Sequence, residues 1–312
     1  MESIRIFAGS GGVQFTDAMC ADLGVERSES RLQRFANDCL QVQLMENCRE
    51  RDVFLVQPIV APTQDNLVEL LLMVDAARGA SAKRVTAVMP HFAYARSDKK
   101  DAARISIGGR LVADMLEAAG VTRVLTMTLH APQVHAFFRV PVDQLHALNE
   151  LADHFRGGDL ANTTVVSPDL GNAKSASKFA RLLGTPMAAG AKERFEGDRV
   201  EISHLIGDVD GRDVIVLDDE IANGTTIDAI LDKLESHGAR KISIACTHGI
   251  FSNGALERIG ADERVSEIVT TDTVPHTLSF AHPKLTVMSA APAFAEAVRR
   301  IHSGESVSAL FA

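Results

Sequence analysis

Short apolar runs alternate with longer amphipathic stretches along the whole chain. Several runs are almost continuous in Val, Ile and Leu, which is typical of strands buried on both faces of a parallel sheet. The strands predicted in this way cover residues 4–8, 53–57, 84–89, 123–128, 164–167, 214–217, 241–247, 267–270 and 285–288. The amphipathic stretches predict helices at 65–79, 107–119, 172–183, 226–238 and 292–302. This alternation indicates an α/β protein with right-handed crossover connections.

The length of the chain and the spacing of its elements indicate two domains. The chain has 312 residues, about twice the length of an ordinary domain. The strongest linker signal within 144–163 is Arg156-Gly-Gly-Asp. We therefore expect an N-terminal domain over 1–145 and a C-terminal domain over 146–312, and we leave open that the last segment packs back on the first domain. Ligands bind beyond the carboxyl ends of parallel strands, so the loops there should carry the chemistry.

Composition and charge exclude several classes of protein. The chain has 32 Lys and Arg against 41 Asp and Glu, a net charge of −9. A general binder of polyanions would carry a basic excess, so we expect no nucleic-acid partner. Apolar residues make up 46% of the chain, which excludes a disordered protein. The longest apolar stretch, 67–77, is interrupted by Glu69 and Asp75 and is too short to cross a bilayer, so we expect no membrane partner.

The N-terminal residues and the cysteines predict a cytoplasmic protein. No basic segment leads into an apolar core after Met1, so we expect no signal peptide. The four cysteines show neither C-x-x-C spacing nor the pattern of a disulfide framework. We therefore expect reduced thiols, as in cytoplasmic proteins.

The strongest chemical signal lies in segment 214–226. It reads Val214-Ile-Val-Leu-Asp-Asp-Glu-Ile-Ala-Asn-Gly-Thr-Thr, a buried strand that ends in two acids, followed by a short loop of small residues that opens a helix. The backbone N–H groups of such a loop converge beside the positive end of the helix dipole, so the loop favours an anion and most naturally a phosphate ester. A plain strand end before a capped helix is the alternative. The paired acids before Gly-Thr-Thr favour the phosphate site.

The residues of this loop suit a phosphorylated sugar. Gly224 permits a backbone conformation that other residues resist. Thr225 and Thr226 add hydroxyl donors. Asp218 and Asp219 can then hold sugar hydroxyls, directly or through a hydrated cation.

Segment 214–226 resembles the phosphoribosyl-pyrophosphate loop of type I phosphoribosyltransferases. A longer resemblance, over about 35–259, is to the ribose-phosphate pyrophosphokinase (phosphoribosyl pyrophosphate synthetase) family. The segments that carry it are Val53-Phe-Leu-Val-Gln-Pro, Ala61-Pro-Thr-Gln-Asp-Asn-Leu, Ala80-Ser-Ala-Lys-Arg-Val-Thr-Ala-Val-Met-Pro, Tyr94-Ala-Arg-Ser-Asp-Lys-Lys, Leu129-His-Ala-Pro-Gln, Ser167-Pro-Asp-Leu-Gly and Thr247-His-Gly-Ile-Phe-Ser. The tail Ile301-His-Ser-Gly-Glu-Ser-Val-Ser also resembles the family's C-terminus.

This resemblance implies a fold, a reaction and an assembly. The fold is α/β, with two type I phosphoribosyltransferase-like domains, each with a mainly parallel sheet flanked by helices. ATP would bind on the first domain and ribose 5-phosphate on the second. The reaction is the transfer of a diphosphoryl group from ATP to the anomeric hydroxyl of ribose 5-phosphate, which gives phosphoribosyl pyrophosphate and AMP, with Mg²⁺ as the cofactor. The assembly is a homo-oligomer built from dimers, with a hexamer as one form.

The resemblance also implies roles for individual residues. Lys192 and Arg194 match the family's mobile loop, which closes over the transferring phosphates, and would be the catalytic residues. The binding residues would be Phe35, Asn37, Arg96 and His130 for ATP, His130 and Asp169 for Mg²⁺, and Asp218, Asp219, Asn223, Gly224, Thr225 and Thr226 for ribose 5-phosphate. Lys99, Lys100 and Arg104 match a region near the family's phosphate or ADP regulatory site between subunits.

Departures from the family pattern lie at functional loops rather than in the core. Where the family commonly has Glu, Gln, Asp, Gly and Asp, this chain has Cys39, Ser97, Thr128, Asn172 and Ala222. Two alternatives to a synthetase therefore stay open. One is a catalytically weak regulatory subunit that joins the oligomers of a standard synthetase, and the other is a phosphoribosyltransferase that acts on a base.

Overall fold

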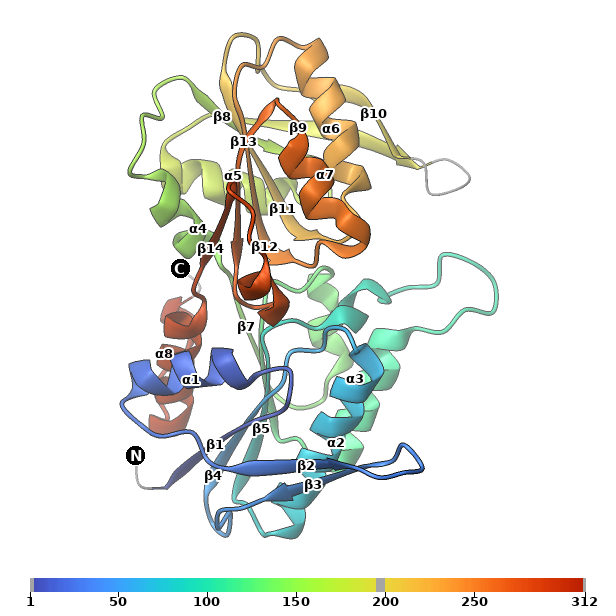
Figure 1. Ribbon diagram of the computed structural model, residues 1–312, viewed down its shortest axis with the longest axis vertical. Helices are drawn as coiled ribbons and strands as arrows, with labels where there is room; N and C mark the ends of the chain where they lie inside the picture. Colours follow the sequence, from blue (N-terminus) through green and yellow to red (C-terminus); the bar gives the residue numbers. More distant parts are fainter. Residues whose placement is uncertain (1–2, 195–199, 311–312) are drawn as a thin grey trace. The chain divides into compact units, whose positions relative to one another are not determined.

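The computed structural model describes residues 3–194 and 200–310, and the chain divides into two compact units. The first unit is Met1–His146 with Thr273–Pro275 and Ala290–Ala312, and the second is Ala147–Asp272 with His276–Ser289. In each unit helices cover a mainly parallel sheet (Figure 1), which confirms the expected α/β fold class. Among the described residues, no helix is long and apolar enough to cross a membrane.

The first unit is built on a five-stranded parallel sheet. In spatial order its strands are β1 (Ile4–Ala8), β4 (Asp52–Val56), β5 (Arg84–Met89), β6 (Arg123–Met127) and β7 (Val142–Leu145). Its helices are α1 (Val13–Leu23), α2 (Thr63–Gly79), α3 (Gly108–Ala119) and α8 (Ala291–Ser303), with 3₁₀ turns at Ala93–Arg96, Pro132–Phe137 and Ser308–Leu310. The strands β2 (Ser30–Arg34) and β3 (Leu40–Leu44) form a separate antiparallel hairpin.

The core of the first unit includes the C-terminal helix. Strand β4 is buried along its whole length, as a continuous apolar run predicts. Helices α1 and α8 pack on each other through an edge-on contact between Phe15 and Phe294, whose ring centroids lie 5.2 Å apart. Helices α2 and α3 cover the other face of the sheet (Figure 1). The last helix of the chain is thus part of the same core as the first.

The second unit is built on a seven-stranded sheet. In spatial order its strands are β10 (Val200–Ile206), β9 (Met187–Arg194), β8 (Thr163–Ser167), β11 (Asp213–Ile221), β12 (Ile242–Gly249), β13 (Val265–Thr271) and β14 (Leu285–Met288). Strand β10 pairs antiparallel with β9. The other six strands, β9, β8, β11, β12, β13 and β14, run parallel to one another. The helices are α4 (Leu148–Phe155), α5 (Ala173–Leu183), α6 (Thr225–Ser236) and α7 (Ala255–Ala261), with 3₁₀ turns at Ser252–Gly254 and Pro275–Ser279.

The strands and helices predicted from the apolar pattern are all present, and their ends differ by a few residues. The elements that the apolar pattern does not predict are the helices α1, α4 and α7 and the strands β2, β3, β7, β9 and β10. The hairpin strands β2 and β3 leave most of their side chains partly or fully exposed, so no apolar run marks them. Strand β10 pairs only at the edge of its sheet, where burial of both faces is not required.

The prediction that Arg156-Gly-Gly-Asp links the two domains is wrong. The chain passes from the first unit to the second at His146 and Ala147, and α4 follows directly. The glycine segment joins α4 to β8 inside the second unit. Glycines and polar residues mark a turn, and a helix–strand connection within a domain needs the same residues as a linker between domains.

Candidate active site

Three acidic residues lie at the carboxyl edge of the second unit's sheet. Strands β8 and β11 are parallel neighbours, with Val166 opposite Val216, so both strands end at the same edge. Asp169 follows the end of β8, and Asp218 and Asp219 lie in the last part of β11. Ligands bind at this edge of parallel α/β sheets.

The Asp218 carboxyl interacts with both of the other acids. Burial raises the pKa of Asp218 well above its ordinary value, and the charges of Asp219 and then Asp169 raise it further. Asp218 Oδ1 also accepts a hydrogen bond from the backbone N–H of Asp219, at 2.9 Å. Acids this close favour a cation or hydroxyl donors that offset their negative charge.

The loop after β11 is a tight turn that leads straight into α6. Gly224 has a φ of 78°, which favours glycine, and a Cβ there would lie 2.8 Å from Nη2 of Arg258, so the arginine would have to move. The backbone N–H of Ser252 donates to the Ala222 carbonyl at 2.9 Å, which ties the turn to the segment after β12. Because α6 begins at Thr225, the N–H groups of its first turn and the positive end of its dipole lie beside this loop.

The Asn223 side chain closes this turn. Its Oδ1 accepts hydrogen bonds from the backbone N–H of Thr225, at 3.3 Å, and from the Thr225 hydroxyl, at 3.1 Å. Such an Asx turn satisfies N–H groups that a helix start leaves unpaired. A phosphate ester bound at this loop would compete with Asn223 for these donors.

Arg258 on α7 places a positive charge against the same loop. Its Nη2 donates to the Asn223 carbonyl at 2.6 Å and forms an ion pair with Asp228 of α6 at 3.1 Å. This arginine could not be predicted from the sequence, because it lies 35 residues after Asn223 and no local pattern marks it. Only the packing of α7 beside α6 brings it to the loop.

Lys192 and Arg194 lie on β9, which pairs antiparallel with the edge strand β10. The backbone of Lys192 pairs with Ile202 and that of Arg194 with Val200. Their side chains lie outside the described part of the structure. Strand β9 is the direct neighbour of β8, and the catalytic roles of these two residues stay a prediction.

In the first unit, Arg96 and His130 lie on neighbouring loops at the carboxyl edge of the sheet. Arg96 ends the 3₁₀ turn after β5, and His130 follows β6. Strands β5 and β6 are parallel neighbours, and a hydrogen bond from Gln133 to Asp98 joins the two loops. Both predicted ATP-binding side chains are exposed, as residues that meet a ligand must be.

Phe35, Asn37 and Cys39 lie at the tip of the β2–β3 hairpin, which projects past α2 (Figure 1). The N–H of Phe35 donates to the Cys39 carbonyl at 2.9 Å, and Asn37 Oδ1 accepts from the Cys39 N–H at 3.3 Å. Phe35 is 42% exposed, and an open aromatic ring can stack on a base. The hairpin is separate from the sheet that carries Arg96 and His130.

Two departures from the family pattern have local structural roles. Ser97 Oγ accepts a hydrogen bond from the N–H of Gly108 at 2.8 Å, so it satisfies a donor at the start of α3. Thr128 has a φ of 41°, in the left-handed region that β-branched residues rarely adopt. This conformation turns the chain between β6 and His130.

The donors of the second unit suit a hydrated Mg²⁺ rather than a closed metal cage. In residues 3–194 and 200–310, no three His, Cys, Asp or Glu side chains are arranged to hold a metal ion. In nucleotide sites Mg²⁺ keeps several waters and takes one or two carboxylates together with phosphate oxygens. The carboxylates of Asp169, Asp218 and Asp219, at the carboxyl edge of the sheet, are donors of this kind.

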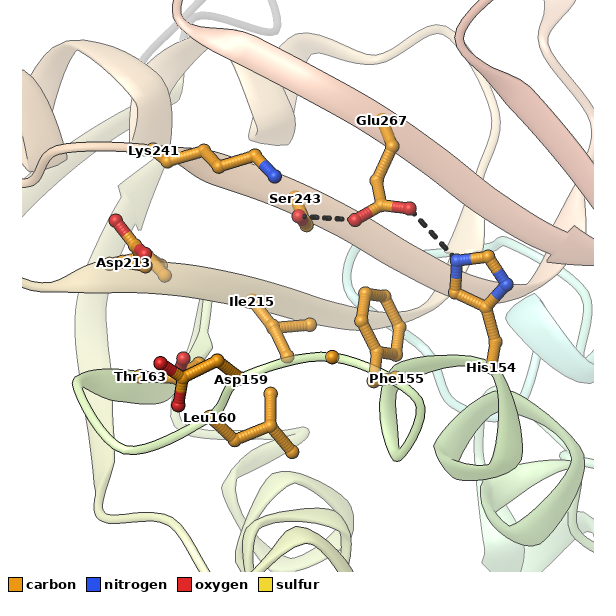
Figure 2. A pocket seen from close by; sticks show the side chains of 12 residues that line it. His154, Phe155, Asp159, Leu160, Thr163, Asp213, Ile215, Lys241, Ser243 and Glu267 are labelled. Atoms are coloured by element: carbon orange, nitrogen blue, oxygen red, sulfur yellow. Dashed lines mark hydrogen bonds and ion pairs between the residues drawn. The ribbon is translucent and has the colours of Figure 1, made fainter.

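A pocket of about 260 Å³ lies at the opposite, amino-terminal edge of this sheet, beside Thr163 and Asp213 (Figure 2). In its wall Glu267 accepts a hydrogen bond from Ser243 Oγ at 2.9 Å and lies 2.8 Å from His154 Nε2. The acid therefore stands between the hydroxyl and the imidazole. In a catalytic triad the imidazole must contact the hydroxyl, so these three residues are not one.

Comparison with known proteins decides the family. The model for the N-terminal domain of ribose phosphate pyrophosphokinase matches residues 4–120, and the model for the phosphoribosyl synthetase-associated domain matches residues 198–312. The chain is 65% identical over 311 residues to a putative ribose-phosphate pyrophosphokinase of Streptomyces coelicolor, which covers 100% of this chain and 98% of that protein. The chain belongs to the ribose-phosphate pyrophosphokinase family.

Other members of the family are similar over the same length. A ribose-phosphate pyrophosphokinase of Deinococcus radiodurans is 47% identical over 313 residues, covering 99% of this chain and 98% of that protein. The crystal structure of phosphoribosylpyrophosphate synthetase from Mycobacterium smegmatis has a TM-score of 0.88 and 36% identity, covering 97% of this chain and 99% of that one. The family membership expected from the sequence segments is confirmed.

Proposed function

We propose that this protein is a ribose-phosphate pyrophosphokinase that makes phosphoribosyl pyrophosphate from ATP and ribose 5-phosphate. The anomeric hydroxyl oxygen attacks the β-phosphorus of ATP and loses its proton, and the bond from that phosphorus to the α–β bridging oxygen breaks. AMP leaves with the bridging oxygen. Full-length similarity to ribose-phosphate pyrophosphokinases, with a twin-acid strand end followed by a helix-opening turn, supports the proposal.

Ribose 5-phosphate would bind at the turn after β11. Its phosphate would accept hydrogen bonds from the first N–H groups of α6 and from the hydroxyls of Thr225 and Thr226, with Arg258 adding positive charge. Asp218 and Asp219 would accept hydrogen bonds from the ribose hydroxyls. This arrangement would hold the sugar by both ends and leave its anomeric hydroxyl to react.

ATP would bind through residues of the first unit. Phe35 would stack on the adenine, Asn37 would hydrogen-bond to it, and Arg96 would bind through its planar guanidinium. His130 and Asp169 would hold Mg²⁺, which when bound supplies positive charge to the triphosphate. Lys192 and Arg194 would stabilise the charge that develops on the transferring phosphoryl oxygens.

The proposal includes a cytoplasmic homo-oligomer built from dimers, with ATP and ribose 5-phosphate as the small-molecule partners. Sedimentation velocity of the purified protein would measure the assembly directly. A monomer at micromolar concentration would contradict this part of the proposal and leave the reaction untouched.

The reaction is tested by incubating the purified protein with ATP, Mg²⁺ and ribose 5-phosphate. We expect AMP and phosphoribosyl pyrophosphate in equal amounts, and Lys192→Ala should reduce both. No product above that variant would overturn the proposal. Activity only after a second synthetase is added would identify a regulatory subunit, and consumption of phosphoribosyl pyrophosphate with a nucleobase would identify a phosphoribosyltransferase.

A further inference from the structure

Asn172 links the turn that carries Asp169 to the strand that carries Asp218. Its Nδ2 donates to the Leu217 carbonyl at 2.9 Å, and its backbone N–H donates to Oδ1 of Asp169 at 3.0 Å. Leu217 directly precedes Asp218 in β11 and lies 45 residues after Asn172. Asn172 is therefore hydrogen-bonded both to Asp169, which follows β8, and to the backbone next to Asp218 in β11.

The Asn172 side chain is not used as a helix cap. Asn172 stands at the N-cap position of α5, where an Asn side chain usually accepts a hydrogen bond from the helix's own first turn. The described first turn of α5 receives no such bond. The residue has a φ of −91° and a ψ of 0°, an ordinary conformation that glycine would also adopt. What asparagine adds to the family's glycine is the bond to Leu217.

The rest of the turn is packed closely around Asp169. The Ser167 hydroxyl donates to the Asp169 carbonyl at 2.6 Å, and a Cβ on Gly171 would lie 3.2 Å from Asp169 Oδ1. On the side of β9, a Cβ on Gly190 would lie 2.8 Å from the Pro168 carbonyl. Packing therefore holds the turn toward β9, and the Asn172 side chain holds it toward β11.

We infer that Asn172 is a positioning residue that fixes Asp169 relative to Asp218 and Asp219 during diphosphoryl transfer. This inference rests on the proposed function, which places the cation of the nucleotide at Asp169 and the ribose hydroxyls at the other two acids. The Asn172 side chain ties this turn to β11, so loss of its bond to Leu217 would let the turn shift relative to Asp218 and Asp219. In-line transfer depends on close placement, and an error of about 1 Å costs on the order of a hundredfold in rate.

The test compares Asn172→Ala with Asn162→Ala in the full-length protein. Asn162 makes the same kind of bond, from its Nδ2 to the Gly211 carbonyl at 2.9 Å, before β8 and therefore away from the carboxyl edge. We expect Asn172→Ala to lower kcat by about ten- to a hundredfold and to raise the Mg²⁺ concentration for half-maximal rate. The KM for ribose 5-phosphate should stay near its wild-type value, because the phosphate turn is not changed. Asn162→Ala should keep all three constants.

Calorimetric binding of Mn²⁺–ATP gives a second measurement that needs no turnover. Its affinity should fall in Asn172→Ala and not in Asn162→Ala. If Asn172→Ala does not fold, Asn172→Gly keeps the backbone conformation and takes its place. Wild-type kinetics and Mn²⁺–ATP affinity in the Asn172 variant, or equal losses in both variants, would overturn the inference. Wild-type protein that binds Mn²⁺–ATP but forms no product would overturn the proposed function, and the two affinities would still show whether Asn172 positions Asp169 for binding of the metal–nucleotide.

Discussion

His302 Nδ1 lies 2.9 Å from Oδ2 of Asp52, although the two residues are 250 positions apart in the sequence. Arg84 of β5 binds the same carboxylate, which is only 4% exposed at the start of β4. The end of α8 is thus fastened to the sheet of the first unit through one buried acid with two basic partners. A buried carboxylate requires such partners, because burial without them is strongly unfavourable.

Replacing this acid should therefore weaken the first unit. We expect Asp52→Asn to lower the free energy of unfolding by about 2 kcal/mol, since it removes charge-assisted hydrogen bonds to Arg84 and His302. Asp17→Asn is the matched control, because Asp17 pairs with Arg27 on the surface with 53% of its side chain exposed, where a pair contributes about 0.5 kcal/mol. Urea denaturation at neutral pH measures both, and equal losses would show that burial of the Asp52 pair does not matter.

Thr128 should be replaceable with a gain in stability. Its φ of 41° is strained for a β-branched residue and is tolerated better by asparagine. We expect Thr128→Asn to raise the free energy of unfolding by about 1 kcal/mol. A loss of stability in thermal denaturation would mean that contacts of the threonine side chain outweigh the strain. Because His130 follows two residues later, the KM for ATP should be measured on the same variant.

Cys39 should be the one fast-reacting thiol among the four cysteines, all of which the structure describes. Burial raises the pKa of Cys246 to about 12, and burial with the charge of Asp17 raises that of Cys20 to about 11. Burial also raises the pKa of Cys48, whereas Cys39 is exposed. The thiolate is the reactive form, so a disulfide reagent at pH 8 should modify one thiol quickly and three slowly.

The same thiol reports on the hairpin tip. Cys39→Ser should remove the fast phase. If the hairpin binds adenine as proposed, saturating ATP should slow modification of Cys39, and ribose 5-phosphate alone should not. A rate that ATP leaves unchanged would show that Cys39 does not face the nucleotide.

The sequence predicts the buried strands and the phosphate turn because their signals are local. The run at 84–89 has four apolar residues in six positions, and β5 has those bounds. The turn is predicted because Asp218, Asp219 and Gly224 follow one another within seven residues. Each of these signals can be read from a single short segment.

Features that depend on contacts between distant segments could not be predicted. Arg258 reaches the turn only because α7 packs beside α6, and Asn172 matters only because its side chain meets Leu217, 45 residues away. Helix α4 is only 8 residues long and lies within the segment where the sequence favoured a linker. Glycine composition near Gly157 marks a turn without showing which elements it joins.

The His154–Glu267 pair in the pocket wall (Figure 2) predicts a dependence of stability on pH. Burial alone would raise the pKa of Glu267, but hydrogen bonds from His154 and Ser243 and the charge of Lys241 outweigh it and lower the pKa. A carboxylate with a lowered pKa stabilises the folded state above its unfolded pKa of about 4.3 and loses this contribution as pH falls through the folded value.

Glu267→Gln should therefore destabilise the protein most above about pH 5, by roughly 1 kcal/mol, and progressively less as the solution becomes more acidic. Glu263→Gln is the matched control, since Glu263 is an exposed glutamate just before the same strand, and its effect should be small throughout. The trend with pH would be measured as the unfolding free energies of the wild type and both variants between pH 3 and pH 7, in steps of about half a pH unit. A difference between wild type and Glu267→Gln that grows toward acid pH would mean that the carboxylate is held in its neutral form, contrary to the hydrogen bonds that it accepts from His154 and Ser243.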